Sequence, residues 1–203
     1  MPYDLIVVGT SMGGLAAIQT FLMGLPADFE PPIAIVQHRS VESTDLMTRI
    51  LRRYTTLALR EPHDKEPIEK GCVYIAPPDY HLMVEPDGFA LSTEGVVTYA
   101  RPSIDVLFDS AADVYKNRLI GIVLTGANHD GAHGATRIKQ AGGIVIVQHP
   151  ATAESSAMPK AAIKAAKVDF VLGLSEISQC VAKLCGYQVG ESGSRGASCS
   201  RVQ

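Results

Sequence analysis

The feature that most constrains the fold is a set of four short, nearly continuous apolar runs, at 4–8, 33–37, 120–124 and 144–148. They are rich in Val and Ile and do not alternate with polar residues, which is typical of strands buried on both faces of a parallel sheet. Helical patterns lie before, between or after these runs, at 13–24, 42–56, 105–116 and 132–141. This order of strands and helices predicts an α/β fold with a doubly wound, mostly parallel sheet and flanking helices.

Residues 72–99 interrupt this alternation. Four short apolar segments follow one another there, separated by turns at 86–88 and 94–95. They predict a small antiparallel hairpin or meander, inserted into the sheet or at its edge. Pro102 and Ser103 then introduce the next helix, with Ser103 as the expected N-cap.

The size and composition fit one folded domain. The chain has 203 residues, of which 46% are hydrophobic and 19% charged, enough apolar surface for a core. We expect this domain to cover residues 1–188. Residues 189–203 are rich in Gly and Ser and poor in apolar side chains, so we expect a disordered tail. Nothing in the sequence determines the oligomeric state.

The charge and the cysteines exclude several classes of protein. The net charge of −3 is too small for broad attraction to nucleic acid or anionic lipid. Because no apolar run approaches the roughly 20 residues of a membrane span, we expect no membrane insertion and a cytoplasmic location. The four cysteines lack CxxC spacing, which favours reduced thiols and no structural zinc.

The first strand leads into Gly9-Thr10-Ser11-Met12-Gly13, and a helical pattern follows. This strand, turn and helix arrangement suits the nucleophile-elbow pattern GxSxG, in which the serine attacks a carbonyl. A glycine-rich turn of this kind also begins dinucleotide and phosphate sites. A GxGxxG site would need glycine at position 11 and an acidic residue after the second strand, where the sequence has Gln37-His38.

Two further polar residues follow other strands of the predicted sheet. His38 follows the second strand, and Asp130 lies in the Gly-rich turn after the run at 120–124. Since the carboxyl ends of parallel strands open into one crevice, we expect Ser11, His38 and Asp130 to meet as nucleophile, base and orienting carboxylate. Taken one at a time, a strand-end histidine or a turn aspartate is more often structural.

The same region offers a rival metal site. His129 and His133 are four residues apart, as in HExxH, with Asp130 in place of the glutamate. That motif needs both histidines on one helix face, whereas His129 belongs to a loop, so we favour the triad. His63, His81 and His149 fit surface or supporting roles, and the last two can line the cleft.

Several further segments lie in order along the chain: VGTSMGG at 8–14, IVQH at 35–38, YIAPPDYHL at 74–82, RPSIDVLF at 101–108, LTGANHDGA at 124–132, QAGG at 140–143 and AMPKA at 157–161. Through these segments, over roughly residues 4–185, the chain resembles the catalytic domain of the CheB family of chemotaxis protein-glutamate methylesterases. The resemblance implies hydrolysis of glutamate methyl esters on the cytoplasmic helices of methyl-accepting chemoreceptors, with glutamine deamidation as a second activity. It also implies Ser11, His38 and Asp130 as catalytic residues, main-chain N–H groups at Met12 and Ala127 as oxyanion donors, and no cofactor or metal.

Three features depart from the family pattern. Members commonly carry an N-terminal receiver domain, whereas this chain starts at the first catalytic-domain strand, so we expect no control by phosphorylation in the same chain. The commoner turn TGMGxDG is TGANHDG here, with Ala127 and Asn128 beside the oxyanion site, and Met12 replaces a small residue. The alternative to an esterase is therefore a CheB-like adaptor in a chemosensory pathway that has lost turnover through loop 127–129.

Overall fold

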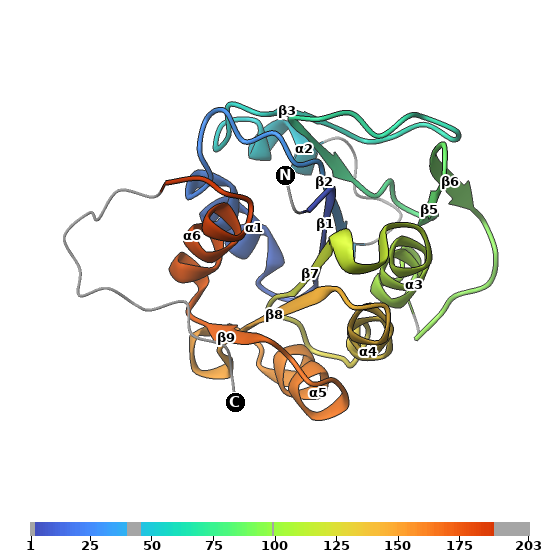
Figure 1. Ribbon diagram of the computed structural model, residues 1–203. Coiled ribbons are helices and arrows are strands. Elements are labelled where there is room, and N and C mark those ends of the chain that lie inside the picture. Colours follow the sequence, from blue (N-terminus) through green and yellow to red (C-terminus); the bar gives the residue numbers. More distant parts are fainter. Residues whose placement is uncertain (1–2, 40–45, 99, 189–203) are drawn as a thin grey trace.

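The computed structural model describes residues 3–39, 46–98 and 100–188 (Figure 1). The predicted tail at 189–203 and the first residues of the predicted helix at 42–56 lie outside these ranges. Within them, the chain forms three layers, a central parallel sheet with helices on both faces, and a separate two-stranded sheet.

The central sheet has seven strands in the order β3-β4-β2-β1-β7-β8-β9, and every neighbouring pair is parallel. The strands are β1 (Leu5–Thr10), β2 (Ile33–Gln37), β3 (Ala58–Arg60), β4 (Cys72–Ile75), β7 (Leu119–Val123), β8 (Ile144–Gln148) and β9 (Phe170–Leu172). The four predicted strands correspond to β1, β2, β7 and β8, which confirms the fold class. The three-residue edge strands β3 and β9 were not predicted, because such short runs carry almost no periodic signal.

Three helices cover each face of the sheet. One face carries α1 (Gly14–Met23), α2 (Leu46–Leu51) and α6 (Leu174–Leu184), and the other carries α3 (Ile104–Tyr115), α4 (Ala132–Gln140) and α5 (Ala157–Ala165). Within β1, Leu5 and Val7 belong to the core under α3, whereas Ile6 and Val8 belong to the core under α1. Both alternating sets are buried, which is why residues 5–8 of the strand are all apolar.

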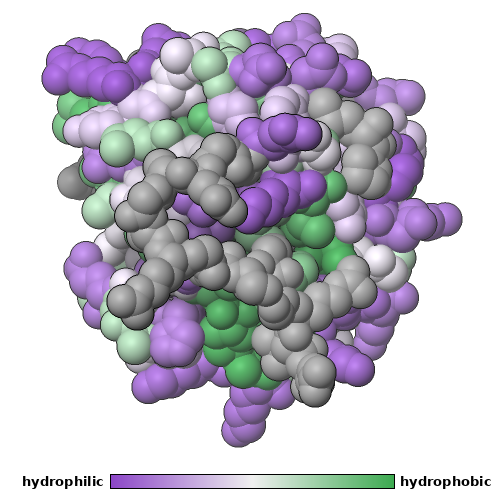
Figure 2. Space-filling model, turned by 60° about the vertical axis from the view of Figure 1, so that its left-hand side comes forward, coloured by the Kyte–Doolittle hydropathy of each residue, from purple (hydrophilic) through white to green (hydrophobic). Residues whose placement is uncertain are grey.

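The described residues also form two short 3-10 helices, η1 (Lys116–Arg118) after α3 and η2 (Pro150–Thr152) after β8. Figure 2 brings the side of α1 and α6 forward, and its coloured surface is mainly hydrophilic with smaller hydrophobic areas. The inner faces of both helices are buried, as the apolar core requires.

The antiparallel insertion is smaller than predicted. Only β5 (His81–Glu85) and β6 (Gly88–Ser92) form the hairpin, which packs on α3 through Leu82 and Val84. β4, predicted as part of the meander, instead pairs in parallel with β2 and β3, because all four of its residues are buried in the main core. Among its described residues, the last predicted segment contributes one bridge, between Val97 and Ala100.

Among the cysteines, Cys72 and Cys185 are free and buried. Cys180 is disulfide-bonded, so the expectation of reduced thiols is wrong for this residue. Sequence spacing does not limit which thiols a fold brings together. Among the described residues, no helix is both long enough and apolar enough for a membrane span.

Candidate active site

The three candidate catalytic residues follow neighbouring strands at the carboxyl edge of the sheet. Ser11 follows β1, His38 follows β2, and Asp130 lies between β7 and α4. β1 lies between β2 and β7, so the three loops open at the same place (Figure 1). The chain leaves β1 for β2 on one side and later returns to β7 on the other, which is the switch point where α/β folds bind ligands.

The turn that carries Ser11 is held through its main chain. The Ser11 N–H donates to Thr125 O at 2.9 Å, and Ser11 O accepts from Gln37 Nε2 at 2.8 Å. Gly13 adopts φ 76°, a left-handed conformation that favours glycine. A Cβ on Gly14 would lie 1.8 Å from Gln37 Oε1 and 2.6 Å from Thr10 Oγ1, so a larger residue there would displace the Gln37 side chain that holds the turn. These constraints explain the small residues of the GxSxG turn.

Asp130 holds His38. The distance from His38 Nε2 to Asp130 Oδ2 is 2.7 Å, and Asp130 is only 1% exposed. Its carboxylate also accepts hydrogen bonds from four other groups, Ser103 Oγ at 3.0 Å and the N–H groups of Ile104 at 2.7 Å, Asp105 at 3.0 Å and Gly131 at 3.0 Å. Two of these N–H groups begin α3, so the carboxylate lies at the positive end of that helix.

These contacts determine the charge of Asp130. Burial acts to raise its pKa, but the hydrogen bonds from His38, Ile104 and Asp105 outweigh burial and lower the pKa below its ordinary value. The ionised carboxylate can only accept, so His38 Nε2 carries the proton. The nitrogen left to act as a base is therefore Nδ1.

Of the three candidate catalytic residues, the structure brings His38 and Asp130 into contact. Within the described residues, no hydrogen bond joins Ser11 Oγ to His38. Their main chains are nevertheless close, because the His38 N–H donates to Thr10 O at 3.1 Å and Gln37 Nε2 bridges Ser11 O and His38 O, each at 2.8 Å. Catalytic hydrogen bonds in unliganded enzymes are often long or absent and form with substrate.

The expected oxyanion donors have free N–H groups. Neither the Met12 nor the Ala127 main-chain N–H donates a hydrogen bond within the described part of the chain, and both residues are exposed. The loop that carries Ala127 lies against the serine turn, since a Cβ on Gly126 would lie 3.0 Å from Ser11 Cβ and 1.9 Å from Met158 Sδ. Glycine at 126 is what allows this approach.

Sequence reasoning missed the residues that support Asp130. Ser103 is the N-cap residue of α3, as predicted, but its side chain makes no capping bond and donates to Asp130, which was not predicted. The Ser103 N–H donates to His81 Nδ1 at 3.2 Å, and His81 Nε2 lies 3.0 Å from Gly95 O. His81 is 2% exposed, so it supports this network from within the fold and does not line the cleft.

Asp105 and Asp130 cap each other's helices. Asp130 accepts from the first N–H groups of α3, and Asp105, the second residue of α3, accepts from Gly134 N in the first turn of α4 at 2.7 Å. Burial and the neighbouring Asp130 charge raise the pKa of Asp105 to about 6, although the Gly134 bond opposes this. The first turns of α3 and α4 therefore lie beside two carboxylates whose pKa values shift in opposite directions, that of Asp130 downward and that of Asp105 upward.

The metal alternative finds no support among the described residues. No group of three or more His, Cys, Asp or Glu side chains there is arranged to hold a metal ion. His133 instead lies 3.4 Å from Asp109, with its side chain 65% exposed, and His129 is exposed. His149 accepts from the Ala151 N–H at 3.2 Å, which is a local turn contact.

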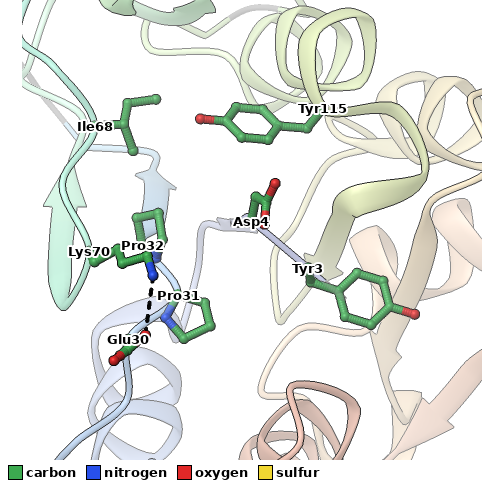
Figure 3. Close-up of a pocket in the computed structure, with 8 residues that line it drawn as sticks. All are labelled: Tyr3, Asp4, Glu30, Pro31, Pro32, Ile68, Lys70 and Tyr115. Carbon is green, nitrogen blue, oxygen red and sulfur yellow. Dashed lines mark hydrogen bonds and ion pairs between the residues drawn. The ribbon is translucent and has the colours of Figure 1, made fainter. Parts of the chain in front are cut away.

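A cavity of about 370 Å³ lies elsewhere in the fold (Figure 3). Its lining is Tyr3, Asp4, Glu30, Pro31, Pro32, Ile68, Lys70 and Tyr115. Most of these residues come just before a strand or end α3, so they belong to the amino edge of the sheet. The cavity is therefore at the opposite edge from Ser11 and does not contribute to the candidate active site.

A family model described as CheB methylesterase matches residues 6–181. The chain belongs to the CheB methylesterase family. A protein of Leptospira interrogans, provisionally named protein-glutamate methylesterase/protein-glutamine glutaminase, is 47% identical over 185 residues, which cover 91% of this chain and 96% of that protein. A Caulobacter vibrioides protein-glutamate methylesterase/protein-glutamine glutaminase is 39% identical over 186 residues, covering 89% of this chain and 54% of the relative.

A solved CheB structure has the same fold. The crystal structure of the Thermotoga maritima CheB methylesterase catalytic domain superposes with a TM-score of 0.87 at 33% identity, covering 90% of this chain and 98% of the solved one. This match confirms the resemblance and the architecture.

Proposed function

We propose that this CheB-family chain is a serine hydrolase that removes methyl esters from glutamate side chains of methyl-accepting chemoreceptors. The observation that carries the proposal is the buried Asp130 carboxylate at 2.7 Å from His38, beside the strand end that presents Ser11. The relatives named as protein-glutamate methylesterases support the same activity. They do not favour the adaptor alternative.

The mechanism follows the usual acyl-enzyme route. Ser11 Oγ attacks the ester carbonyl while His38 Nδ1 takes its proton, and the oxyanion accepts hydrogen bonds from the Met12 and Ala127 N–H groups. The tetrahedral intermediate collapses, His38 returns the proton to the leaving oxygen, and methanol departs. Water then attacks the acyl-enzyme with His38 as base, which releases glutamate and restores Ser11.

Two side-chain conditions apply to this route. Ser11 Oγ and His38 Nδ1 must come within hydrogen-bonding distance when substrate binds, by side-chain rotation. Asp130 must stay ionised to stabilise the imidazolium, which its lowered pKa favours at neutral pH.

The same residues suit a second activity. A glutamine amide can follow this route with ammonia as the leaving group, and the relatives' names pair the two activities. We infer the cytoplasmic helices of the receptors as the partner, and hence a cytoplasmic location. The proposed chemistry requires no cofactor or metal.

The test is methanol release from a methylated receptor fragment. We expect Ser11→Ala to lower the rate by at least about 10³-fold, because the nucleophile is lost. Ser175→Ala, at an exposed position of α6, is the matched control and should leave the rate unchanged. A serine-directed phosphonate should label the unmodified protein at Ser11 and should not label that residue's alanine variant.

Two outcomes would contradict the proposal. Equal methanol release by the unmodified protein and Ser11→Ala would remove Ser11 from the mechanism. Absence of both methanol release and phosphonate labelling in the unmodified protein would favour the adaptor.

A further inference from the structure

Asn128 lies against both members of the His38–Asp130 pair. Its Oδ1 accepts a hydrogen bond from the Asp130 main-chain N–H at 3.1 Å. Its Nδ2 lies 3.4 Å from His38 Nδ1, a long but directed contact. The side chain therefore contacts the one ring nitrogen that Asp130 does not hold.

The orientation of the Asn128 amide follows from its partners. A main-chain N–H can only donate, so the atom opposite Asp130 N must be the amide oxygen. The atom opposite His38 Nδ1 is then the amide nitrogen, which can only donate. Turning the amide over would place two donors together at Asp130 N and lose that bond.

The protonation of His38 is then specified from both sides. Asp130 accepts from Nε2–H, and Asn128 donates to Nδ1, so both contacts are satisfied only by the neutral ring with Nδ1 bare. In the imidazolium, Nδ1–H would face the Asn128 N–H groups. Asn128 therefore opposes protonation of His38 at Nδ1, whereas Asp130 favours the charged ring.

The other charged groups near His38 make their contacts elsewhere. Asp130 is the charged side chain in contact with His38 among the described residues, and Asp105 lies behind it. Arg39, the next residue along the chain, donates to Glu61 Oε1 and Ala76 O instead. The contact at Nδ1 is thus left to the neutral amide.

We propose that Asn128 is a positioning residue that holds the His38 ring with Nδ1 unprotonated, so that Nδ1 can accept the Ser11 proton once the amide has moved away. This inference rests on the proposed function for the role of Nδ1, but the contact itself can be measured without activity. During turnover the amide must move off Nδ1 when Ser11 transfers its proton. Asn128 thus helps to fix which ring nitrogen of His38 faces the serine turn without a proton.

The experiment is an NMR titration of the ring nitrogens in ¹⁵N-histidine-labelled protein. Asn128→Asp is the informative variant, because one oxygen can keep the Asp130 N–H bond while the other replaces the donor opposite Nδ1 with an acceptor. We expect the midpoint of His38 protonation to move up by about one pH unit relative to the unmodified protein. His129→Ala, at the exposed neighbouring position, should leave the midpoint unchanged.

Asn128→Gly provides a second variant that removes the side chain without adding charge. It should move the His38 midpoint in the same direction by a smaller amount, and this variant decides the matter if Asn128→Asp does not fold. In methanol release, the acid limb of the kcat profile should move with the NMR midpoint, with KM little changed. A purely structural role would lower the free energy of unfolding without moving the midpoint.

The outcomes separate the inference from the proposed function. If His38 titrates alike in the unmodified protein, Asn128→Asp and Asn128→Gly, the amide does not act on Nδ1 and the inference is overturned. If the midpoint moves as expected, the contact is supported whatever the esterase assay shows. Failure of the proposed function is read separately, from methanol release and phosphonate labelling.

Discussion

At the carboxyl edge of the sheet, Asp130 and Ser103 are almost completely buried and hydrogen-bonded to each other. At the amino edge, Glu30 and Lys70 form an ion pair with side chains 54% and 77% exposed. Asp4 at that edge pairs with Arg118, and both side chains are partly exposed. Acidic residues thus occur at both edges, but the carboxyl edge holds Asp130 by several N–H groups, including the first two of a helix.

The direction of the helices explains the difference. The connections run from the carboxyl end of one strand to the amino end of the next, so α3 and α4 begin at the carboxyl edge. Helix starts present free N–H groups and a positive partial charge, which stabilise carboxylates. The amino edge receives helix ends, and its acids pair with basic side chains, although Asp169 there also accepts from the Val145 N–H at 2.8 Å. A fixed carboxylate can orient a base, whereas a solvated ion pair contributes little.

The largest expected effect is on the rate of methanol release, when an aspartate at the carboxyl edge and one at the amino edge are replaced separately. Asp130→Asn should lower the rate of methanol release by about 10³ to 10⁴-fold, because an amide cannot stabilise the imidazolium or hold its tautomer. Asp4→Asn, at the amino edge, should leave the rate unchanged. Comparable losses in both variants would show that the two edges do not differ as described.

A smaller effect is expected on stability. Ser103→Ala removes a buried hydrogen bond to an ionised carboxylate and should lower the free energy of unfolding by about 1.5–3 kcal/mol. Lys70→Ala breaks an exposed ion pair and should cost about 1 kcal/mol or less. Urea denaturation of both variants measures the difference. A Lys70→Ala loss as large as that of Ser103→Ala would refute the contrast between buried and solvated contacts.

The smallest expected effect is on the pH dependence of the free energy of unfolding, to which the carboxylates of Asp105 and Asp130 contribute. The pKa of Asp105 is raised to about 6 in the folded protein, so its contribution to stability is present at low pH and is lost as pH rises through 6. The pKa of Asp130 is lowered, so its contribution is present above the ordinary aspartate pKa and is lost as pH falls through the folded value.

Asp105→Asn isolates the first of these contributions. Its side-chain oxygen can still accept from Gly134 N but does not ionise. Between pH 5 and pH 8, the variant should therefore lose less free energy of unfolding than the unmodified protein, by up to about 1 kcal/mol. Urea denaturation at the two pH values tests this. The same pH dependence in both proteins would contradict a raised Asp105 pKa.

Much of the site could be predicted, because the residues that follow parallel strands lie at the same edge of the sheet. Residues just after strands 5–10, 33–37 and 119–123 must gather at one edge, so Ser11, His38 and Asp130 could be proposed as neighbours from the sequence. The boundary of the insertion was less predictable. β4 and β5 are both short apolar segments, and only their pairing partners distinguish a sheet strand from a hairpin strand.

The sequence by itself determined the layer architecture, the glycine-rich turns and the family. Strand burial and local backbone geometry depend directly on the types of residue and their spacing. Only the tertiary structure decided what surrounds Asp130. The Ser103 hydroxyl, the start of α3 and the Asn128 amide come from separate segments, and their hydrogen bonds depend on packing distances that no local pattern encodes. Those contacts, more than the identities of the three candidate residues, determine which nitrogen of His38 is left to act as a base.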